Sequence, residues 1–210
     1  MKHKFTTMIM ALAAMGALAT QANAVTYDFQ SNGSNMDLGP TSTFTVGGFS
    51  LTASGFLTSG GPTDLYAKFT LGDPSETGLG TVSDPSGQHE IVTTNFVQLT
   101  LPTTPPSNFN LVLLASVQSG EQAKVWFQPL SSPGTLVGAT LIGTITNADG
   151  SVTIPAIYQT GFIDITAGAA NILLESATIS VPDSGSAVAL LGIALAGIEG
   201  VRRALRARRA

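Results

Sequence analysis

The stretch VTTNFVQLTL, at residues 92–101, is the strongest single strand in the chain. β-Branched and aromatic residues, which favour extended backbone, are frequent in it, and polar and apolar residues alternate along its second half. It ends before Pro102, which has no amide hydrogen to donate to a neighbouring strand. A strand of this kind is half-buried in a sheet, and the segments around it indicate which kind of sheet.

Similar short segments, each closed by turn residues, lie on both sides of this strand. They are residues 25–29, 42–46, 49–53 and 65–71 before it, and 109–118, 124–128, 136–145, 152–157, 162–166 and 172–181 after it. The glycine pair at 47–48 predicts a hairpin. Spacings of about eight to twelve residues, without a convincing amphipathic helix, are typical of antiparallel sandwiches and barrels. We expect an all-β fold, an antiparallel β-sandwich of jelly-roll type, because two facing sheets bury the alternate apolar residues.

The proline-rich link at residues 102–106 interrupts this series of strands. Such a link can mark a domain boundary. With roughly 75 residues on each side, however, we expect it to connect the two sheets of one core.

The last thirty residues carry a different signal, in three parts. The first part is a turn that a protease can reach, formed by Val181, Pro182, Asp183, Ser184 and Gly185. The second is an apolar run at 187–201, in which Glu199 is the single charge. The third is a basic tail at 202–210 with the arginines Arg202, Arg203, Arg206, Arg208 and Arg209. Positive charge after a membrane segment marks the side that stays in the cytoplasm.

The length of the apolar run bears on its role. Together with Ser186 before it, the run has sixteen residues, 186–201, which span roughly 24 Å as a helix, less than the ~30 Å hydrocarbon core of a bilayer. Such a transmembrane helix is marginal as a permanent anchor but sufficient for a transient one that a membrane protease cuts. The alternative is a helix that lies on the membrane or packs on the domain. It is disfavoured because the run is apolar all round from Ala187 to Ile198.

This order of motif, apolar helix and arginine cluster resembles the PEP-CTERM class of bacterial sorting signals, and residues 181–185 match its VPDSG variant. The resemblance implies recognition by an exosortase-type membrane transpeptidase, usually in Gram-negative bacteria that make exopolysaccharide. Glu199 departs from the pattern, but an ion pair with Arg202 or Arg203 is available to it at helical spacing.

The N-terminus carries a matching export signal. Lys2 and Lys4 precede an apolar stretch at 8–19, and Ala22-Asn23-Ala24 supplies small residues at the two positions that signal peptidase reads. We therefore expect residues 1–24 to be a signal peptide and Val25 to be the mature N-terminus. A first core helix is the alternative, which the basic start disfavours. The body at 25–180 is then exported, held transiently at the inner membrane, and delivered to the cell surface or extracellular matrix.

Composition agrees with an exported body. Counted from Val25 to Asp183, the body has two basic residues, Lys68 and Lys124, against twelve acidic ones, so its net charge is −10, whereas the whole chain has −4. Such a body does not attract nucleic acid or anionic lipid, but it suits a solvated surface protein or one that binds divalent cations. The chain has no cysteine, so a packed core rather than disulfides must stabilise it.

One long segment, residues 72–90, departs from strand and turn. It is rich in glycine and carries Asp73, Glu76, Asp84 and Glu90. We expect a loop without regular structure, and such loops are usually functional or disordered. Clustered carboxylates suit calcium, which takes six to eight oxygen ligands, so the segment is a candidate metal site with calcium as the cofactor. A solvated acidic loop without an ion is the alternative.

Part of this segment also bears a resemblance. ETGLG at residues 76–80, with Glu90-Ile91 and the strand at 96–99, is similar to a pattern in many sorted surface proteins of the PEP-CTERM class. The pattern covers under thirty residues and implies no activity.

Enzyme chemistry finds little support. His89 is the one histidine that remains after removal of the signal peptide, and no Gly-x-Ser-x-Gly nucleophile motif accompanies it. One histidine without cysteine does not build a zinc site unless carboxylates supply every other ligand. A carboxylate pair for glycoside hydrolysis stays open, because the sequence does not show distances in space. We predict no catalytic residue.

Two functions remain. The first is an exported, non-catalytic cell-surface or matrix protein, processed by signal peptidase and an exosortase-type enzyme and placed among exopolysaccharide. The alternative is a carbohydrate-binding module, stabilised by calcium, in which Trp126 and Tyr158 can form a platform for sugar stacking. We also expect at least one neighbour of Trp126 to face the core.

Overall fold

The computed structural model describes residues 23–30, 34–101 and 107–181, together with residues 192, 194, 195, 197, 198 and 202. Residues Ala24–Val181 form one compact unit, and Met1–Asn23 with Pro182–Ala210 form the other.

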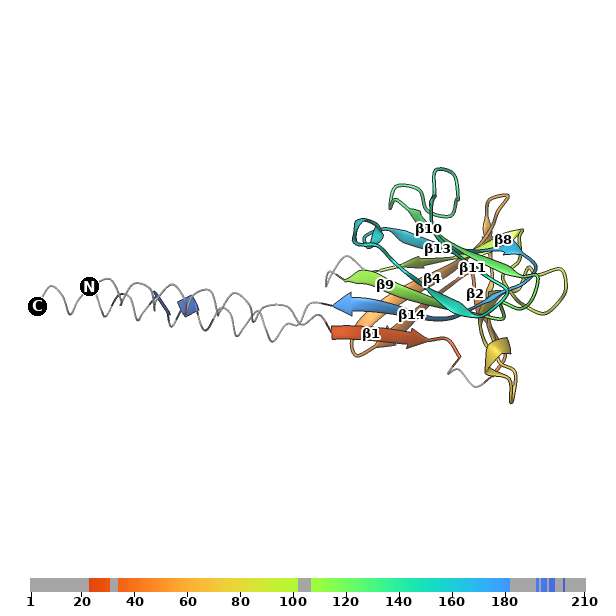
Figure 1. The fold of residues 1–210 in the computed structure, drawn as a ribbon, viewed down its shortest axis with the longest axis horizontal. Coiled ribbons are helices and arrows are strands. Elements are labelled where there is room, and N and C mark those ends of the chain that lie inside the picture. The colour runs from red at the N-terminus through yellow and green to blue at the C-terminus, as the bar shows by residue number, and fades with distance from the viewer. Residues whose placement is uncertain are drawn as a thin grey trace, which may run out of the picture. The chain divides into compact units, whose positions relative to one another are not determined.

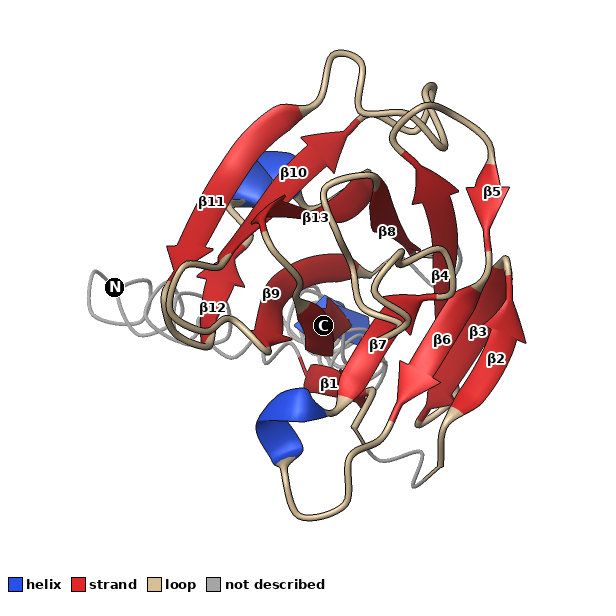
Figure 2. Cartoon of the chain, turned by 90° about the vertical axis from the view of Figure 1, so that its right-hand side faces the viewer, coloured by secondary structure: helices blue, strands red, loops and turns tan. Residues whose placement is uncertain are grey.

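The first unit contains two antiparallel sheets that face each other (Figures 1 and 2). Sheet A has the order β12 (Gly150–Thr153), β9 (Asn108–Ala115), β14 (Leu173–Val181), β7 (Gly78–Thr81), β6 (Leu65–Lys68) and β2 (Met36–Gly39), and β1 (Asn23–Asp28) also pairs with β14. Sheet B has the order β11 (Thr140–Thr146), β10 (Gln122–Gln128), β13 (Phe162–Ala169), β8 (Asn95–Thr100), β4 (Phe49–Leu57) and β3 (Thr41–Val46), and β5 (Pro62–Thr63) pairs with β4. The predicted all-β antiparallel sandwich is confirmed. Its jelly-roll subtype stays a prediction.

Alternation along the strands produces the core between the sheets. On β8, Val97 and Leu99 belong to the buried core cluster, while Phe96 and Gln98, which alternate with them, point to the opposite face of sheet B. Sheet A supplies core residues such as Leu114 and Leu174. Burying one such side chain contributes roughly 1.5–3 kcal/mol, so this row of alternating residues stabilises the sandwich.

Several predicted segments are confirmed with small changes in their ends. The hairpin at 47–48 is present, since β3 and β4 pair from Val46↔Phe49 to Thr41↔Ser54. The strand predicted at 92–101 begins at Asn95, because the amide of Val92 donates to Asn95 Oδ1 over 2.8 Å and closes a turn. Ile91, just before this turn, forms a bridge with Ile172 on the side of sheet A. The chain therefore changes sheets between residues 91 and 95.

The proline-rich link connects the two sheets, as expected, because β8 belongs to sheet B and β9 to sheet A. The link itself lies outside the described residues. Three other segments end differently from the prediction. The strand at 65–71 stops at Lys68, residues 136–139 precede β11, and residues 156–158 form the 3₁₀ helix η2 (Ala156–Tyr158).

The expectation of a structureless loop at 72–90 was wrong. The segment contains the 3₁₀ helix η1 (Pro74–Glu76) and strand β7, which pairs with β6 at four successive positions. Strand β7 is hard to predict from the sequence because it contains Gly78 and Gly80, and glycine is rare in strands. Gly80 is required because a Cβ at this position would overlap the carbonyl oxygen of His89.

Candidate functional site

The four acidic residues of the candidate calcium site do not share one cage. Glu76 and Glu90 converge on Lys68 of β6, whose Nζ lies 2.8 Å from Glu76 Oε2 and also donates to Glu90 Oε1. The side chains of Lys68 and Glu90 are only 12% and 4% exposed. The two carboxylates therefore neutralise a buried lysine.

The polar groups around Glu76 complete this cluster. Its Oε1 accepts hydrogen bonds from Gln118 Nε2 at 2.6 Å and Ser116 Oγ at 3.1 Å. Burial opposes ionisation of Glu76, but Lys68 outweighs it and holds the pKa below its usual value. Burial raises the pKa of Glu90, which Lys68 offsets only in part. The cluster is thus a satisfied ion network, with no oxygen of Glu76 free of a protein donor.

The other two acids have local partners. Asp73 is the N-cap of η1 and accepts hydrogen bonds from the amide and the hydroxyl of Ser75. Asp84 accepts from the hydroxyl of Ser86 and from the amides of Ser86 and Gln88. Burial opposes ionisation of Asp84, yet these bonds keep its pKa below the usual value. Within the described ranges, no three acidic or histidine side chains are grouped so as to hold a metal ion. Calcium at Asp73, Glu76, Asp84 and Glu90 stays a prediction.

His89 lies beside the ion network without joining it. Its ring stacks on Tyr66, with 4.0 Å between the ring centroids, and its backbone has a φ of 61°. Its Nδ1 is buried and has no hydrogen-bond partner in the part of the chain that the structure describes. The stacking on Tyr66 indicates that the His89 ring has a packing role, rather than the role of a base that activates a nucleophile.

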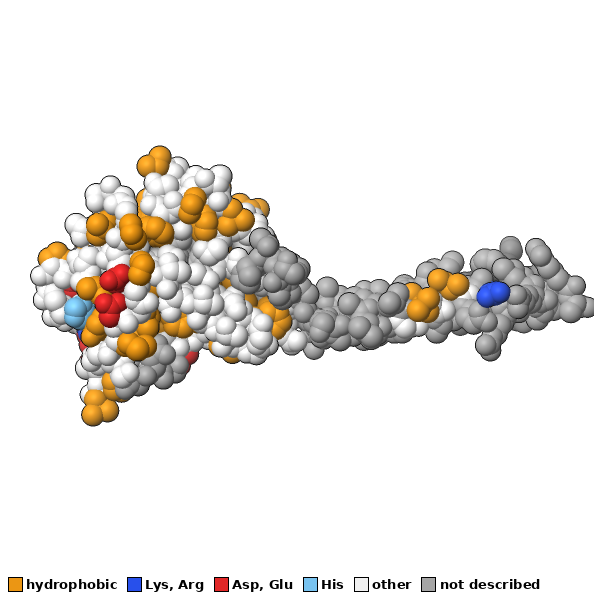
Figure 3. All heavy atoms as spheres, turned by 180° about the vertical axis from the view of Figure 1, so that it is seen from behind, with side chains coloured by type: hydrophobic (Ala, Val, Ile, Leu, Met, Phe, Trp, Pro, Cys, Tyr) orange, Lys and Arg blue, Asp and Glu red, His pale blue; other side chains and the backbone are white. Residues whose placement is uncertain are grey.

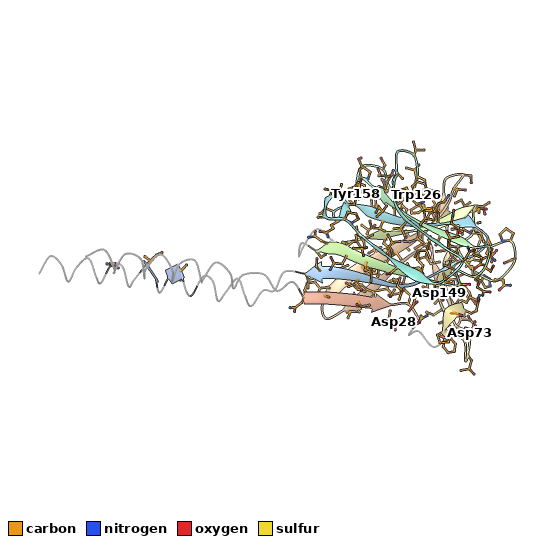
Figure 4. The ribbon with its side chains drawn as sticks, in the orientation of Figure 1. Asp28, Asp73, Trp126, Asp149 and Tyr158 are labelled. Carbon is orange, nitrogen blue, oxygen red and sulfur yellow. The ribbon has the colours of Figure 1, made fainter. Side chains whose placement is uncertain are left out.

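A second acidic group, which the sequence did not reveal, comprises Asp28, Asp149 and Glu175. Burial and then the charges of Asp149 and Asp28 raise the pKa of Glu175. Figure 4 shows Asp28 and Asp149 on the same side of the sandwich as Asp73. Three segments far apart in the sequence bring these acids together, which no local motif indicates. Figure 3 shows the molecule from the side opposite to Figure 4, and this face has few charged side chains among the described residues.

The outer face of sheet B, turned away from the core, is the second candidate surface. Trp126 of β10 lies on this face, because its neighbour Val125 is fully buried and Phe127 packs against the core. Its indole Nε1 donates to Thr166 Oγ1 over 2.9 Å. The expectation that a neighbour of Trp126 faces the core is confirmed.

Tyr158 does not share this face. Its ring contacts that of Phe127, with 5.0 Å between centroids, and it packs against the core cluster. Phe127 and Trp126 are consecutive in one strand and point to opposite faces. The expected joint platform of Trp126 and Tyr158, both labelled in Figure 4, is therefore wrong.

Polar side chains cover much of the outer face around Trp126. Lys124 lies opposite Thr166 in the register of β10 and β13. Further along the sheet, three hydrogen bonds between hydroxyl groups link β3 to β4: Thr41–Ser54 at 3.1 Å, Thr43–Thr52 at 3.2 Å and Thr45–Ser50 at 3.1 Å. The strands of sheet B contain only two charged residues, Lys124 and Asp164. The face combines one fixed indole with neutral hydrogen-bonding groups.

The chain ends of the sandwich lie next to each other in sheet A. Thr26 Oγ1 and Thr178 Oγ1 are 2.9 Å apart, and the amide of Phe29 donates to the carbonyl of Glu175. The start of β1 is thus adjacent to the end of β14. Val181, the last residue of β14, is 2% exposed and belongs to the core cluster.

Comparison with protein families identifies the segment that begins at the end of β14. Residues 180–205 match the family model described as the VPDSG-CTERM motif. This segment is a PEP-CTERM-type sorting signal. The resemblance drawn from the sequence is confirmed, and the VPDSG-CTERM motif implies export, a surface location and processing by an exosortase-type enzyme.

The VPDSG-CTERM motif is only partly described by the structure. Val181 is in place, whereas Pro182, Asp183, Ser184 and Gly185 lie outside the described residues, as do Arg203, Arg206, Arg208 and Arg209. Arg202 and the described residues at 192, 194, 195, 197 and 198 are helical and exposed. In the described part of the chain, no helix reaches the length and apolarity needed to cross a bilayer. At the other end, Ala24 and Val25 lie in β1, and Ala22 is outside the described residues.

No curated protein sequence matches the chain. Among solved structures, the chain is similar to the CBM22-1–GH10 modules of a Clostridium thermocellum endo-1,4-β-D-xylanase complexed with xylohexaose (9% identity, TM-score 0.35, 76% of this chain and 28% of that one). It is also similar to the C-terminal CBM6 of a laminarinase from Zobellia galactanivorans (10% identity, TM-score 0.31, 75% and 99%). A third is an exo-β-1,3-galactanase from Phanerochaete chrysosporium with galactose (15% identity, TM-score 0.33, 77% and 30%). The chain spans about a third or less of the xylanase and galactanase chains.

Proposed function

We propose that this chain is an exported, non-catalytic protein of the cell surface or extracellular matrix, processed at both ends. Signal peptidase releases Val25, and an exosortase-type enzyme acts at the VPDSG-CTERM motif. The match of residues 180–205 to this motif carries the proposal. The helix at 187–201 spans the inner membrane until the cut, and the basic tail at 202–210 holds its end in the cytoplasm.

The ends of the sandwich support this processing. From Thr26 to Phe29 the partner residue moves back from Thr178 to Glu175, so β1 and β14 run antiparallel. The mature N-terminus and the sorting motif therefore emerge at one end of sheet A. A cut before Val25 removes only Asn23 and Ala24 from β1, and both are exposed.

The position of Val181 supports a cut on its C-terminal side. Val181 is buried in the core, and Pro182 has no amide hydrogen with which to extend the ladder of β14. An enzyme that acts from Pro182 onward leaves every core residue of β14 on the released domain.

Cell fractionation with intact-mass measurement tests this function. We expect a surface form that begins at Val25, ends beyond Val181 and lacks the arginines. Pro182→Ala combined with Asp183→Ala is expected to accumulate uncut in the inner membrane, while the control Pro133→Ala, in an exposed turn, is processed normally. Surface protein that still ends at Ala210 would contradict the proposal.

We propose carbohydrate binding as a second function, on the outer face of sheet B. The observation that favours it is Trp126, which is partly exposed and whose indole is hydrogen-bonded to Thr166, on a face that carries neutral hydroxyl pairs along β3 and β4. Sugars stack on aromatic rings through their C–H faces and hydrogen-bond through their hydroxyls. The exopolysaccharide beside the sorted protein is the expected ligand.

Affinity electrophoresis in gels that contain exopolysaccharide from the exporting cells tests the second function. We expect saturable retardation that free oligosaccharide from the same polymer relieves. Trp126→Ala is expected to remove it, and Tyr158→Ala, which alters an aromatic residue behind the sheet, is expected to retain it. Equal retardation of the wild type and Trp126→Ala would refute this site.

Calcium is the one cofactor that we propose, at Asp73, Glu76, Asp84 and Glu90. Binding there has to compete with Lys68 for two of the four carboxylates. Because a ligand of the native state stabilises it, saturating calcium should raise the Tm, and a chelator should reverse the rise. A Tm that is the same with calcium and with chelator would exclude the site.

A further inference from the structure

The loop at residues 129–139, between β10 and β11, covers part of the outer face of sheet B. Phe96, Gln98 and Asp164 point away from the core, yet they are 0%, 2% and 0% exposed. The loop accounts for this burial. Gly134 has a φ of +70°, and a Cβ at this position would lie 2.7 Å from the ring of Phe56, which stacks on Phe96.

Two glutamines hold this loop down. At its middle, the amide of Gly134 donates to Gln98 Oε1 over 3.3 Å. At its two ends, Gln128 Nε2 donates to the carbonyls of Ser132 and Val137, at 3.4 and 3.0 Å. In the described residues, few other polar contacts attach the loop to the sheet. The side-chain amides of Gln98 and Gln128 therefore hold the loop in position.

Gln98 connects the middle of the loop to a carboxyl group. Its Nε2 donates to Asp164 Oδ1 over 2.8 Å, so Asp164, Gln98 and the amide of Gly134 form one hydrogen-bonded chain. The orientation of the Gln98 amide, and with it the acceptor for Gly134, depends on this carboxyl. We call the three residues the latch.

The second oxygen of the carboxyl is an exception to the rule that buried polar atoms are paired. Among the described residues, Asp164 Oδ2 has no hydrogen-bond partner, and neither does Gln128 Oε1. Gln128 is diagonal to Asp164 on the same face, because Trp126 pairs with Asp164 and Gln128 pairs with Phe162. Both atoms are buried acceptors without a donor in the described part of the chain. A proton on Asp164 converts one of them into a donor.

The surroundings of Asp164 offer little to stabilise its charge. The strands on either side, β8 and β10, contribute one charged residue, Lys124, which pairs with Thr166 rather than with Asp164. Strands β4 and β11 and the loop 129–139 contain no titratable residue. Burial raises the pKa of Asp164 to about 7, and the single bond from Gln98 lowers it only in part.

We propose that the loop 129–139 is a cover for the outer face of sheet B that closes when Asp164 is protonated and is released when Asp164 ionises. This inference concerns regulation of the proposed carbohydrate site and rests on that function for its purpose. An ionised Asp164 requires water, and the loop lies on the outer face of the sheet, so it can move aside to admit water without opening the core.

Release would change what the face offers to a saccharide. The aromatic pair Phe56–Phe96 and the amide of Gln98 become accessible next to Trp126, and Asp164 becomes an acceptor for sugar hydroxyls. Carboxylates, amides and aromatic rings are the groups that orient neutral polyhydroxyl ligands. The closed state at acidic pH presents only the part of the face around Trp126 and Lys124.

The direction of the pH dependence follows from proton linkage. A closed loop keeps the proton on Asp164 up to about pH 7, whereas a hydrated carboxyl loses it near its ordinary value of 3.8. Opening therefore releases a proton between these two values. The equilibrium constant for opening should rise by up to about tenfold per pH unit across this range and level off above pH 7.

Hydrogen–deuterium exchange of the purified full chain tests the latch. Peptides that cover residues 129–139 are followed from pH 4 to pH 9, with correction for intrinsic exchange rates. We expect the wild-type loop to lose protection by about tenfold per pH unit up to about pH 7 and to stay level above it. Asp164→Asn, which keeps the acceptor for Gln98 but cannot ionise, should show no such slope. The segment around Gly47-Gly48 is the internal control and should be level in both proteins.

A second variant keeps the test informative whatever Asp164→Asn does to folding. Gln98→Met removes the link between Asp164 and Gly134, so the loop should lack protection already at pH 5. Wild-type protection in this variant, a level wild-type profile, or an unchanged slope in Asp164→Asn would each overturn the proposal.

Loop exchange is measured without saccharide, so it fails or succeeds independently of the carbohydrate function. A correct slope without any polysaccharide binding would remove the carbohydrate function and retain the cover. Binding that depends on Trp126 together with a level slope would retain the carbohydrate function and remove the cover.

Discussion

Gln98 and Asp164 lie directly opposite each other on β8 and β13, and within the described residues one hydrogen bond of 2.8 Å from the Gln98 amide is the only partner of a fully buried carboxyl. A neutral carboxyl tolerates such a site, whereas a charged one does not. This pair links the stability of the sandwich to pH.

The first prediction concerns Asp164→Asn. The pKa of Asp164 is raised from 3.8 to about 7, so the contribution of Asp164 to wild-type stability is most favourable at low pH, falls as the pH rises between these values, and is level above them. The unfolding free energy of the variant, minus that of the wild type, should therefore grow by up to about 4 kcal/mol from pH 4 to pH 8. Opening of the loop 129–139 reduces this difference, because the opened loop lets water hydrate the charge of Asp164. Urea denaturation of both proteins at each pH measures the difference in unfolding free energy.

Asp37→Asn is the matched control, since Asp37 is exposed and its Oδ1 accepts a bond from the amide of Gly39. Its denaturation profile should run parallel to the wild type. A constant difference between Asp164→Asn and the wild type at all pH values would contradict the prediction.

The sequence predicted the sandwich because its apolar residues alternate. On β8 and β13, the apolar residues at alternate positions are the ones that face the core, so the sequence pattern agrees with the burial in the structure. It missed β7, because Gly78 and Gly80 are poor strand residues, and tertiary packing rather than propensity requires them. It also extended a strand into residues 136–139, which instead belong to the loop over sheet B.

The candidate sites were harder to predict, since they depend on distant parts of the chain. The acidic segment suggested calcium, but two of its carboxylates form ion pairs with Lys68. Lys68 lies on a strand outside this segment, so the sequence of the segment does not reveal the pairing. Asp164 left one visible signal, a single charge inside the apolar run FIDIT. Its partner Gln98 is 66 residues away, and only the sheet register brings the two together.

The second prediction concerns Lys68→Met. The substitution keeps most of the apolar stem but leaves Glu76 and Glu90 without their cation, at side-chain exposures of 21% and 4%. Removing one partner of a buried ion pair costs on the order of 3 kcal/mol. Thermal denaturation at pH 7 measures the loss, which should shrink as the pH is lowered and the carboxylates are protonated.

Lys124→Met is the control for this prediction, because it also removes a lysine but no ion pair of the described residues involves Lys124. We expect a change within about 0.5 kcal/mol. Equal losses for the two lysine variants would show that general charge, rather than the network, stabilises the domain.

The third prediction concerns Gly80→Ala. A methyl group at this position overlaps the carbonyl oxygen of His89, so β7 or the segment before Glu90 has to move. Overpacking of this kind costs typically about 1–3 kcal/mol. Gly150→Ala is the matched control in the same sheet, because the three atoms nearest to a Cβ there are side-chain carbons of Ile145 at 3.4–3.8 Å. A Tm of Gly80→Ala as high as that of Gly150→Ala would contradict the close approach of these two segments.

The last prediction concerns where the sandwich ends. Strand β14 lies between β9 and β7 in sheet A and also pairs with β1, and its last five residues include the buried Ala177, Ile179 and Val181. A fragment of residues 25–181 should therefore fold by itself, with the circular dichroism of a β protein and a cooperative thermal transition. A fragment that stops at Ser176 loses three core side chains, each contributing roughly 1–3 kcal/mol, together with most of the pairing with β9, and should remain unfolded. A folded 25–176 fragment would show that sheet A does not need the end of β14. The sorting enzyme could then cut within the strand, instead of being confined to the residues after Val181.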